Sequence, residues 1–180
     1  MKTANIQNQK ILLQLYGMLH CSFARYLSYA RPWSRRPYTL LMAISRKLAD
    51  DHQHYANEIA HLLASRRQLS SPPTFPTEFT YFNDVSLEHL APVLMQHQRI
   101  LIGVTSAATG VLAADQEAKR ILALLLASLR QYGDLLEELL TRGPKSSFLI
   151  DPAQTMESIQ GSPSRIESYD SAWAETQTAA

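Results

Sequence analysis

Apolar residues recur at steps of three and four in four stretches of the chain, a spacing typical of helices that bury one face. The first two stretches cover roughly residues 5–31 and 37–69. The third opens after Asp84 or Ser86 and ends before a short link at 110–114, and the fourth covers roughly residues 115–142. No stretch alternates strictly between apolar and polar residues, as a half-buried strand does. The pattern therefore predicts an all-α fold of four helices.

The links between the predicted helices set their directions. The links at 32–37 and 110–114 are short, so each joins two antiparallel helices. The link at 70–85 is long, and its aromatic residues can pin it to the outside of the bundle; they are Phe75, Phe79, Tyr81 and Phe82. About 17 extended residues span about 56 Å, enough to run the length of a helix. Two hairpins joined by one such crossover form a ferritin-like four-helix bundle with the second and third helices parallel.

The chain divides into this bundle, over residues 1–142, and a tail over residues 143–180. Ser, Pro, Thr, Gln and Glu dominate the tail, and its apolar residues are isolated. Such a composition cannot bury enough apolar surface to offset the entropy of folding, so the tail is predicted to be mostly disordered. Its isolated apolar residues could dock on the bundle or bind a protein partner.

Composition narrows the possible functions. The 17 Lys and Arg residues balance 16 Asp and Glu residues, so no overall field attracts nucleic acid. Cys21 is the single cysteine, which excludes an intrachain disulfide and a thiolate metal cluster. No apolar run approaches the roughly 18 to 20 residues of a membrane span, and the first residues do not resemble a signal peptide. We therefore expect a cytoplasmic protein that binds neither membrane nor nucleic acid.

Candidate chemistry lies near the middle of the second predicted helix. Asp51 and His54 are three residues apart, so both project from the same side of that helix. The apolar residues Leu48, Tyr55 and Leu62 define its inward direction. At 100° per residue, Asp51 lies about 50° from that direction and His54 about 110° from it. Asp51 is therefore predicted to point inward and His54 to lie at the boundary of the helix.

Two histidines of other predicted helices are expected to lie at a similar height along the bundle to Asp51. His97 occupies a core position of the third helix, and His20 lies near the middle of the first, whereas His52 is interpreted as a surface or boundary residue. One interpretation is a buried hydrogen-bonded network in which Asp51 contacts His97, joined by Tyr26, Tyr55 and Ser128. The other is a mononuclear site for ferrous iron, manganese or zinc, with ligands from Asp51, His54, His97 and His20. Both remain open, as does a different register that would keep the histidines apart.

Short motifs in the predicted helices resemble those of a known family. Residues 26–31 contain the pattern Tyr-x-x-x-Ala-Arg, similar to a stretch of bacterioferritins, and Asp51-x-x-His54 resembles the Glu-x-x-His of their second helix. Residues 94–99 and 134–139 are similar in pattern to the DNA-protecting starvation ferritins. This resemblance to the ferritin-like superfamily covers about residues 5–142, and it implies a four-helix bundle with a di-iron centre.

The ligands of that di-iron centre are largely missing. The family pattern places a carboxylate seven residues before Tyr26, where this chain has Leu19, and the neighbouring His20 is only a partial substitute. The second Glu-x-x-His is expected at 128–132, and a bridging glutamate near 96–98, but neither stretch contains a carboxylate. Two iron ions need about four carboxylates and two histidines between them. A ferroxidase centre of the usual kind is therefore not expected.

These observations predict a divergent ferritin-like bundle without a complete ferroxidase centre. We expect a non-catalytic structural or interaction module that forms a homo-oligomer, with a dimer favoured. The alternative is a metal-dependent oxidoreductase or a metal-storage protein that uses Asp51, His54, His97 and His20.

Overall fold

The structure is a computed structural model, and it describes residues 2–34, 40–68 and 73–142. In these ranges it contains helices and no strand. The elements are α1 (Lys2–His20), α2 (Phe23–Ala30), α3 (Leu40–Ser65), the 3-10 helix η1 (Thr77–Phe82), α4 (Leu87–Val111) and α5 (Gln116–Arg142). The prediction of an all-α fold is confirmed for this part of the chain. The predicted tail at 143–180 lies outside the described residues.

The first predicted helix is broken into α1 and α2. Ser22 has extended backbone angles, with φ −67° and ψ 154°, and its hydroxyl accepts a hydrogen bond from the backbone N–H of Arg25. This is the geometry of an N-cap, in which a side-chain oxygen satisfies an N–H that the helix leaves without a partner. The prediction of one continuous helix over 5–31 is therefore wrong at Ser22. The apolar spacing continues through the break and hides the capping serine.

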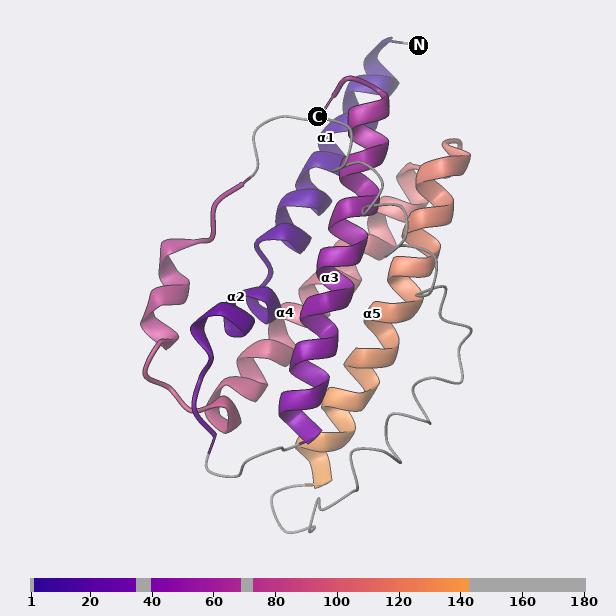
Figure 1. The fold of residues 1–180 in the computed structure, drawn as a ribbon. Coiled ribbons are helices and arrows are strands. Elements are labelled where there is room, and N and C mark those ends of the chain that lie inside the picture. The colour runs from indigo at the N-terminus through magenta and orange to yellow at the C-terminus, as the bar shows by residue number, and fades with distance from the viewer. Residues whose placement is uncertain (1, 35–39, 69–72, 143–180) are drawn as a thin grey trace, which may run out of the picture. The chain divides into compact units, whose positions relative to one another are not determined.

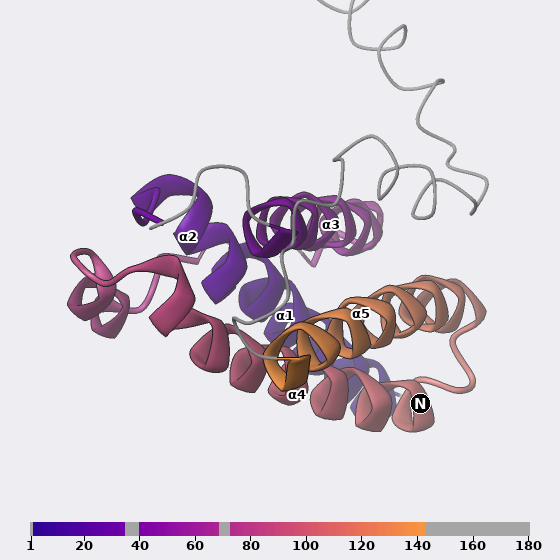
Figure 2. The ribbon, with the colours of Figure 1, turned by 90° about the horizontal axis from the view of Figure 1, so that it is seen from below.

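The long helices enclose a common core. α3 packs against α1 and α2 on one side and against α5 on the other, while α4 packs against α5 and α1. Figure 2 shows this arrangement from below, with α1 between α3 and α4. In Figure 1, α3 and α4 both run upward, whereas α1 and α5 run downward. The long link that joins α3 to α4 thus connects two helices that run in the same general direction.

The link between α3 and α4 is held against α2 by aromatic contacts. The ring centroids of Phe79 and Phe82 each lie 5.2 Å from that of Phe23, and both contacts are edge-to-face. The Phe75 ring lies 5.9 Å from the Tyr26 ring. Tyr81 instead is 81% exposed. Three of the four aromatic residues predicted to pin the crossover therefore do so, because such edge-to-face pairs remove ring surface from water.

The core consists of two hydrophobic clusters stacked along the bundle. One contains α1 and the second half of α3, with residues such as Leu15 and Leu63. The other contains α2 and the first half of α3, with residues such as Phe23 and Leu48. α4 and α5 contribute to both clusters. The boundary between the clusters lies at the α1–α2 break, and buried polar side chains occupy it.

Candidate functional site

A layer of buried polar groups crosses the bundle between the two hydrophobic clusters. It consists of the side chains of Ser22, His52 and Gln98 together with the backbone carbonyl of Leu129, so it joins the α1–α2 break to α3, α4 and α5. The three side chains belong to residues that are 5%, 2% and 1% exposed, respectively. We call this set the polar layer. Because polar groups are costly to bury without partners, their hydrogen bonds define what the layer can do.

Ser22 contacts His52 at the ring nitrogen Nδ1. The Ser22 hydroxyl oxygen accepts the N–H of Arg25 at 3.3 Å and lies 2.8 Å from His52 Nδ1. A hydroxyl can accept a second hydrogen bond or donate its own hydrogen, so the other side of the ring indicates the tautomer: Gln98 raises the pKa of His52, as an acceptor beside Nε2 does, and Nδ1 then accepts the Ser22 hydrogen. The imidazole hydrogen then resides on Nε2. The capping serine of α2 therefore also orients the buried histidine of α3.

Gln98 completes the layer on the other side of the ring. Its Nε2 donates to the carbonyl of Leu129 at 2.8 Å, which leaves its Oε1 as an acceptor. Within the described residues, no hydrogen bond of good geometry satisfies Gln98 Oε1 or His52 Nε2. These two atoms are an acceptor and a donor, and the Gln98 side chain is near enough to raise the pKa of His52. The amide and the imidazole thus form a complementary pair.

Burial keeps His52 neutral. It lowers the pKa of the imidazole to about 3, a shift that Gln98 opposes and the positive charge of Arg25 increases. The ring is therefore uncharged near neutral pH, and so is the rest of the polar layer. A base with such a low pKa, enclosed between apolar clusters, is poorly matched to general acid–base catalysis at neutral pH. The layer is suited instead to holding four elements in register.

On both α3 and α4, the polar position that faces the core is one residue later in the sequence than predicted. Asp51 and His97 were predicted to point inward, but the residues in the core are their neighbours His52 and Gln98. On α3 the small residues Ala49 and Ala56 are also buried. Including such residues turns the inward direction by about 40° toward His52. Counting only the large apolar residues caused the error.

Asp51 lies at the edge of the α3–α5 contact. Its carboxylate accepts a hydrogen bond from the hydroxyl of Ser128, so this pair of the predicted network is confirmed. The Tyr132 hydroxyl is nearby, and burial, with a further contribution from the Asp51 charge, raises the pKa of Tyr132 to about 12. Burial and the same charge also raise the pKa of Tyr55. Asp51 therefore has polar neighbours from α3 and α5.

His97 belongs to the aromatic cluster of α2 and the crossover. Its ring stacks on Phe23 at a centroid distance of 5.0 Å and meets Phe79 edge-on at 5.5 Å. Burial among these rings lowers the pKa of His97. Within the described residues, no hydrogen bond or ion pair joins His97 to Asp51, whose partner is Ser128. The predicted contact between Asp51 and His97 is therefore wrong.

The other two candidate ligands also have separate surroundings. His54 is exposed and its ring contacts that of Tyr55. His20 is partly exposed and its ring contacts that of Tyr16, while partial burial and the charge of Arg25 lower its pKa. No group of three or more His, Cys, Asp or Glu residues that could hold a metal ion occurs in the part of the chain that the structure describes. The predicted set of Asp51, His54, His97 and His20 is thus not brought together.

Comparisons with protein-family models, with curated proteins and with solved structures found no match to this chain. Among the described helices, none is both long and apolar enough to cross a membrane.

Proposed function

We propose that this protein is a non-catalytic helical-bundle module with a ferritin-like arrangement and without a ferroxidase centre. The direction of α3 and α4 and the long link between them support this arrangement. So does the packing of α3 on α1 and α5, with α4 on the remaining side. The broken first helix is a departure from four continuous helices.

The observation that carries the proposal is the neutral polar layer. At the height where a bundle of this kind builds a metal centre from inward carboxylates and histidines, this chain has Ser22, His52 and Gln98. With the imidazole hydrogen on Nε2, the lone pair of His52 Nδ1 faces the Ser22 hydroxyl, 2.8 Å away. The nearest candidate carboxylate, Asp51, is hydrogen-bonded by Ser128. This donor set does not fit a metal ion, which favours a structural or interaction role over oxidoreductase or storage activity.

We also propose that the module forms a homodimer. Large apolar side chains are exposed on the outer surfaces of α4 and α5: Ile100 is 47%, Val111 57% and Leu124 53% exposed. Where such side chains form a contiguous patch, that patch is commonly covered in an assembly. Light scattering coupled to gel filtration tests this part, and a monomer at micromolar concentration contradicts it.

The metal content of the purified protein tests the main proposal. The protein is expressed in medium supplemented with iron, manganese and zinc, purified without chelator, and analysed for these elements. The proposal predicts far less than one ion per chain and a melting temperature that neither chelator nor added metal changes, because a specifically bound ion stabilises the folded state. One ion per chain, together with a melting temperature that chelator lowers, would support the metal-dependent alternative instead.

A further inference from the structure

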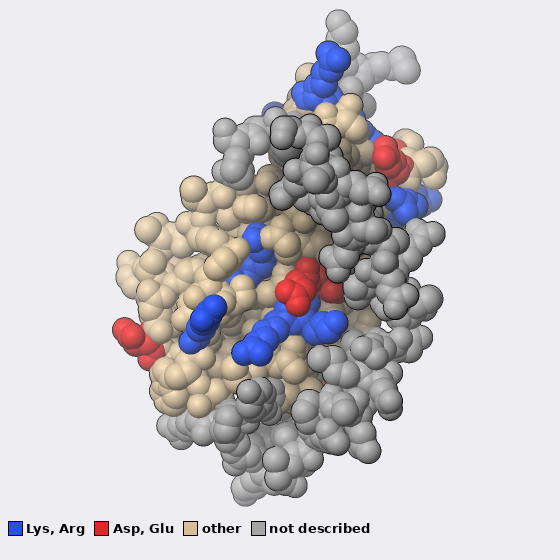
Figure 3. All heavy atoms as spheres, in the orientation of Figure 1, with Lys and Arg blue, Asp and Glu red and all other residues tan. Residues whose placement is uncertain are grey.

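A cleft of about 450 Å³ lies between the end of α2 and the first turns of α3, beside the start of α4. This volume is within the range of about 300–1,000 Å³ that small-molecule sites occupy. Leu27 of α2 and Leu87 of α4 supply apolar surface, and Arg31, Arg46 and Ser45 supply polar groups. The cleft therefore combines an apolar wall with two cationic side chains. In Figure 3, several basic side chains lie over α2 and the lower half of α3 on the visible face, with acidic side chains among them.

The two arginines of the cleft have no acidic partner among the described residues. The ion pairs found among the described residues are formed by Arg66 and Arg99, which do not line the cleft. Ser45 is 7% exposed, and its hydroxyl forms no hydrogen bond with another described residue, so it is a further donor at the cleft. Guanidinium groups bind carboxylate and phosphate oxygens through paired N–H donors. An anionic group is therefore the complement of this end of the cleft.

The backbone of Arg31 supplies an independent observation. Arg31 ends α2 in the left-handed conformation, with φ 48° and ψ 59°, and its N–H donates to the carbonyl of Leu27. Glycine adopts this conformation more easily than any residue with a side chain. Arginine at this position thus has a conformational cost, and it puts a guanidinium group at the wall of the cleft. Arg67 has a similar φ of 55° at the end of α3, and it does not line the cleft.

From these contacts, we propose that this cleft binds a small amphipathic anion, a carboxylate or phosphate monoester attached to an apolar group. The anion contacts Arg31, Arg46 and Ser45, and the apolar group contacts Leu27 and Leu87. The proposal does not depend on the ferritin-like arrangement or on the metal content of the bundle.

Trp33 provides a reporter for binding. It is 53% exposed and follows Pro32, which lines the cleft. Trp173 is the other tryptophan of the chain, so the W173F protein carries Trp33 as its single indole fluorophore. The test titrates this full-length protein with octanoate, octyl phosphate, inorganic phosphate and 1-octanol, all below micelle-forming concentrations. Amide shifts of Ser28 and Ser45 in NMR spectra provide a second readout.

The proposal predicts saturable binding of octanoate and octyl phosphate, and at least tenfold weaker binding of inorganic phosphate and octanol, because each lacks one of the two groups. The tighter of the two octyl anions identifies the preferred head group. R46Q is expected to weaken binding about tenfold or more, since it removes a charged hydrogen-bond donor. R120Q, which changes an exposed arginine near the opposite end of the bundle, should leave the affinity unchanged.

A second pair of variants separates the effect of the Arg31 side chain on binding from the effect of its backbone conformation on stability. R31G should raise the melting temperature and weaken binding, whereas R67G should raise the melting temperature and leave binding unchanged. The proposal is overturned if neither readout saturates with either anion, if R46Q binds as tightly as R120Q, or if octanol binds as tightly as octanoate.

Discussion

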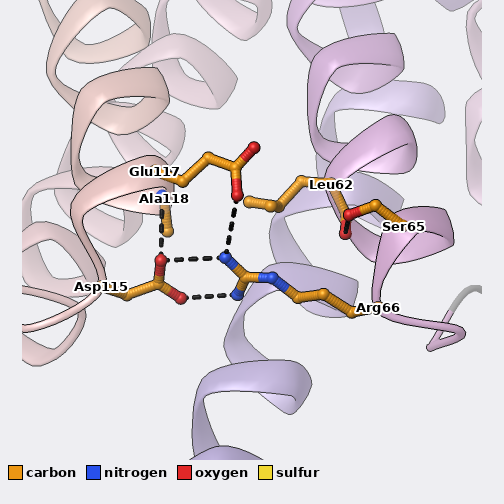
Figure 4. A network of polar contacts seen from close by, with 6 residues as sticks. All are labelled: Leu62, Ser65, Arg66, Asp115, Glu117 and Ala118. Carbon is orange, nitrogen blue, oxygen red and sulfur yellow. Dashed lines mark hydrogen bonds and ion pairs between the residues drawn. The ribbon is translucent and has the colours of Figure 1, made fainter.

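Arg66 forms a two-pronged ion pair with Asp115, with its NH1 at 2.5 Å and its NH2 at 2.9 Å from the two carboxylate oxygens. Asp115 in turn accepts the backbone N–H of Ala118 at 3.2 Å, so it caps α5. Figure 4 shows this contact between the end of α3 and the start of α5, with Glu117 close to the same guanidinium group. Arg66 therefore joins the end of α3 to the start of α5.

Two substitutions at Asp115 separate the contribution of the ion pair to stability from the contribution of the helix cap. D115N retains a good capping side chain and loses the charge, and it should lower the free energy of unfolding by about 1 kcal/mol. D115A loses both functions and should cost about 2 kcal/mol. Urea denaturation at pH 7 measures both values; equal losses would show that only the ion pair contributes, and no loss in D115N would show that only the cap does.

The effect of D115N should depend on pH in a defined direction. The hydrogen bonds from Arg66 hold the pKa of Asp115 below its ordinary value. A depressed carboxyl pKa stabilises the fold above the unfolded value of about 3.9, and this stabilisation is lost as the pH falls through the folded value. The difference between the natural protein and D115N should therefore shrink below about pH 4. A difference in stability that grew as the pH fell would contradict a stabilising ion pair.

Ser22 has two roles, so its removal should be costly. S22A removes the cap of α2 and leaves His52 Nδ1 without its donor. The two losses together should lower the free energy of unfolding by about 2–4 kcal/mol. S28A is the matched control, because the Ser28 hydroxyl donates only to the Arg25 carbonyl on the exposed side of the same helix. A similar small loss for both variants would show that Ser22 is not part of a buried network.

Substitutions at His52 and Gln98 should be strongly coupled. Q98L removes the acceptor beside His52 Nε2, whereas the Leu129 carbonyl keeps its partner within α5, and the variant should cost about 2–3 kcal/mol. In the double variant H52L/Q98L the buried imidazole N–H is gone as well, and much of that loss should be recovered. A double-mutant cycle measured by urea denaturation gives the coupling. Strictly additive losses would mean that the two side chains do not interact.

The sequence predicted the helical architecture well because apolar periodicity is a strong signal over long segments. The lengths of the links predicted which helices pair, and the aromatic residues Phe75, Phe79 and Phe82 predicted where the crossover packs. The break at Ser22 was missed, since a capping serine inside a periodic run changes only one position of the pattern. Tertiary contacts determine such a break.

The prediction of the candidate site was wrong for a different physical reason. On α3, Asp51 and His52 differ by 100° around the helix, so a modest error in the inward direction exchanges one for the other. The same applies to His97 and Gln98 on α4. Charged and aromatic residues attract a chemical interpretation, whereas a glutamine in a core position does not. Weighting buried alanines such as Ala49 and Ala56 equally with leucines would have identified His52.

His52 is neutral and buried at the centre of the polar layer, and NMR of the imidazole nitrogens can test this state. Long-range proton–nitrogen spectra of the natural protein, assigned by comparison with H52L, report the tautomer and the charge of this ring. We expect a neutral ring with its hydrogen on Nε2 at pH 7, no protonation above about pH 4, and no change on adding zinc. Protonation near pH 6.5, a hydrogen on Nδ1, or a nitrogen shift induced by zinc would contradict it.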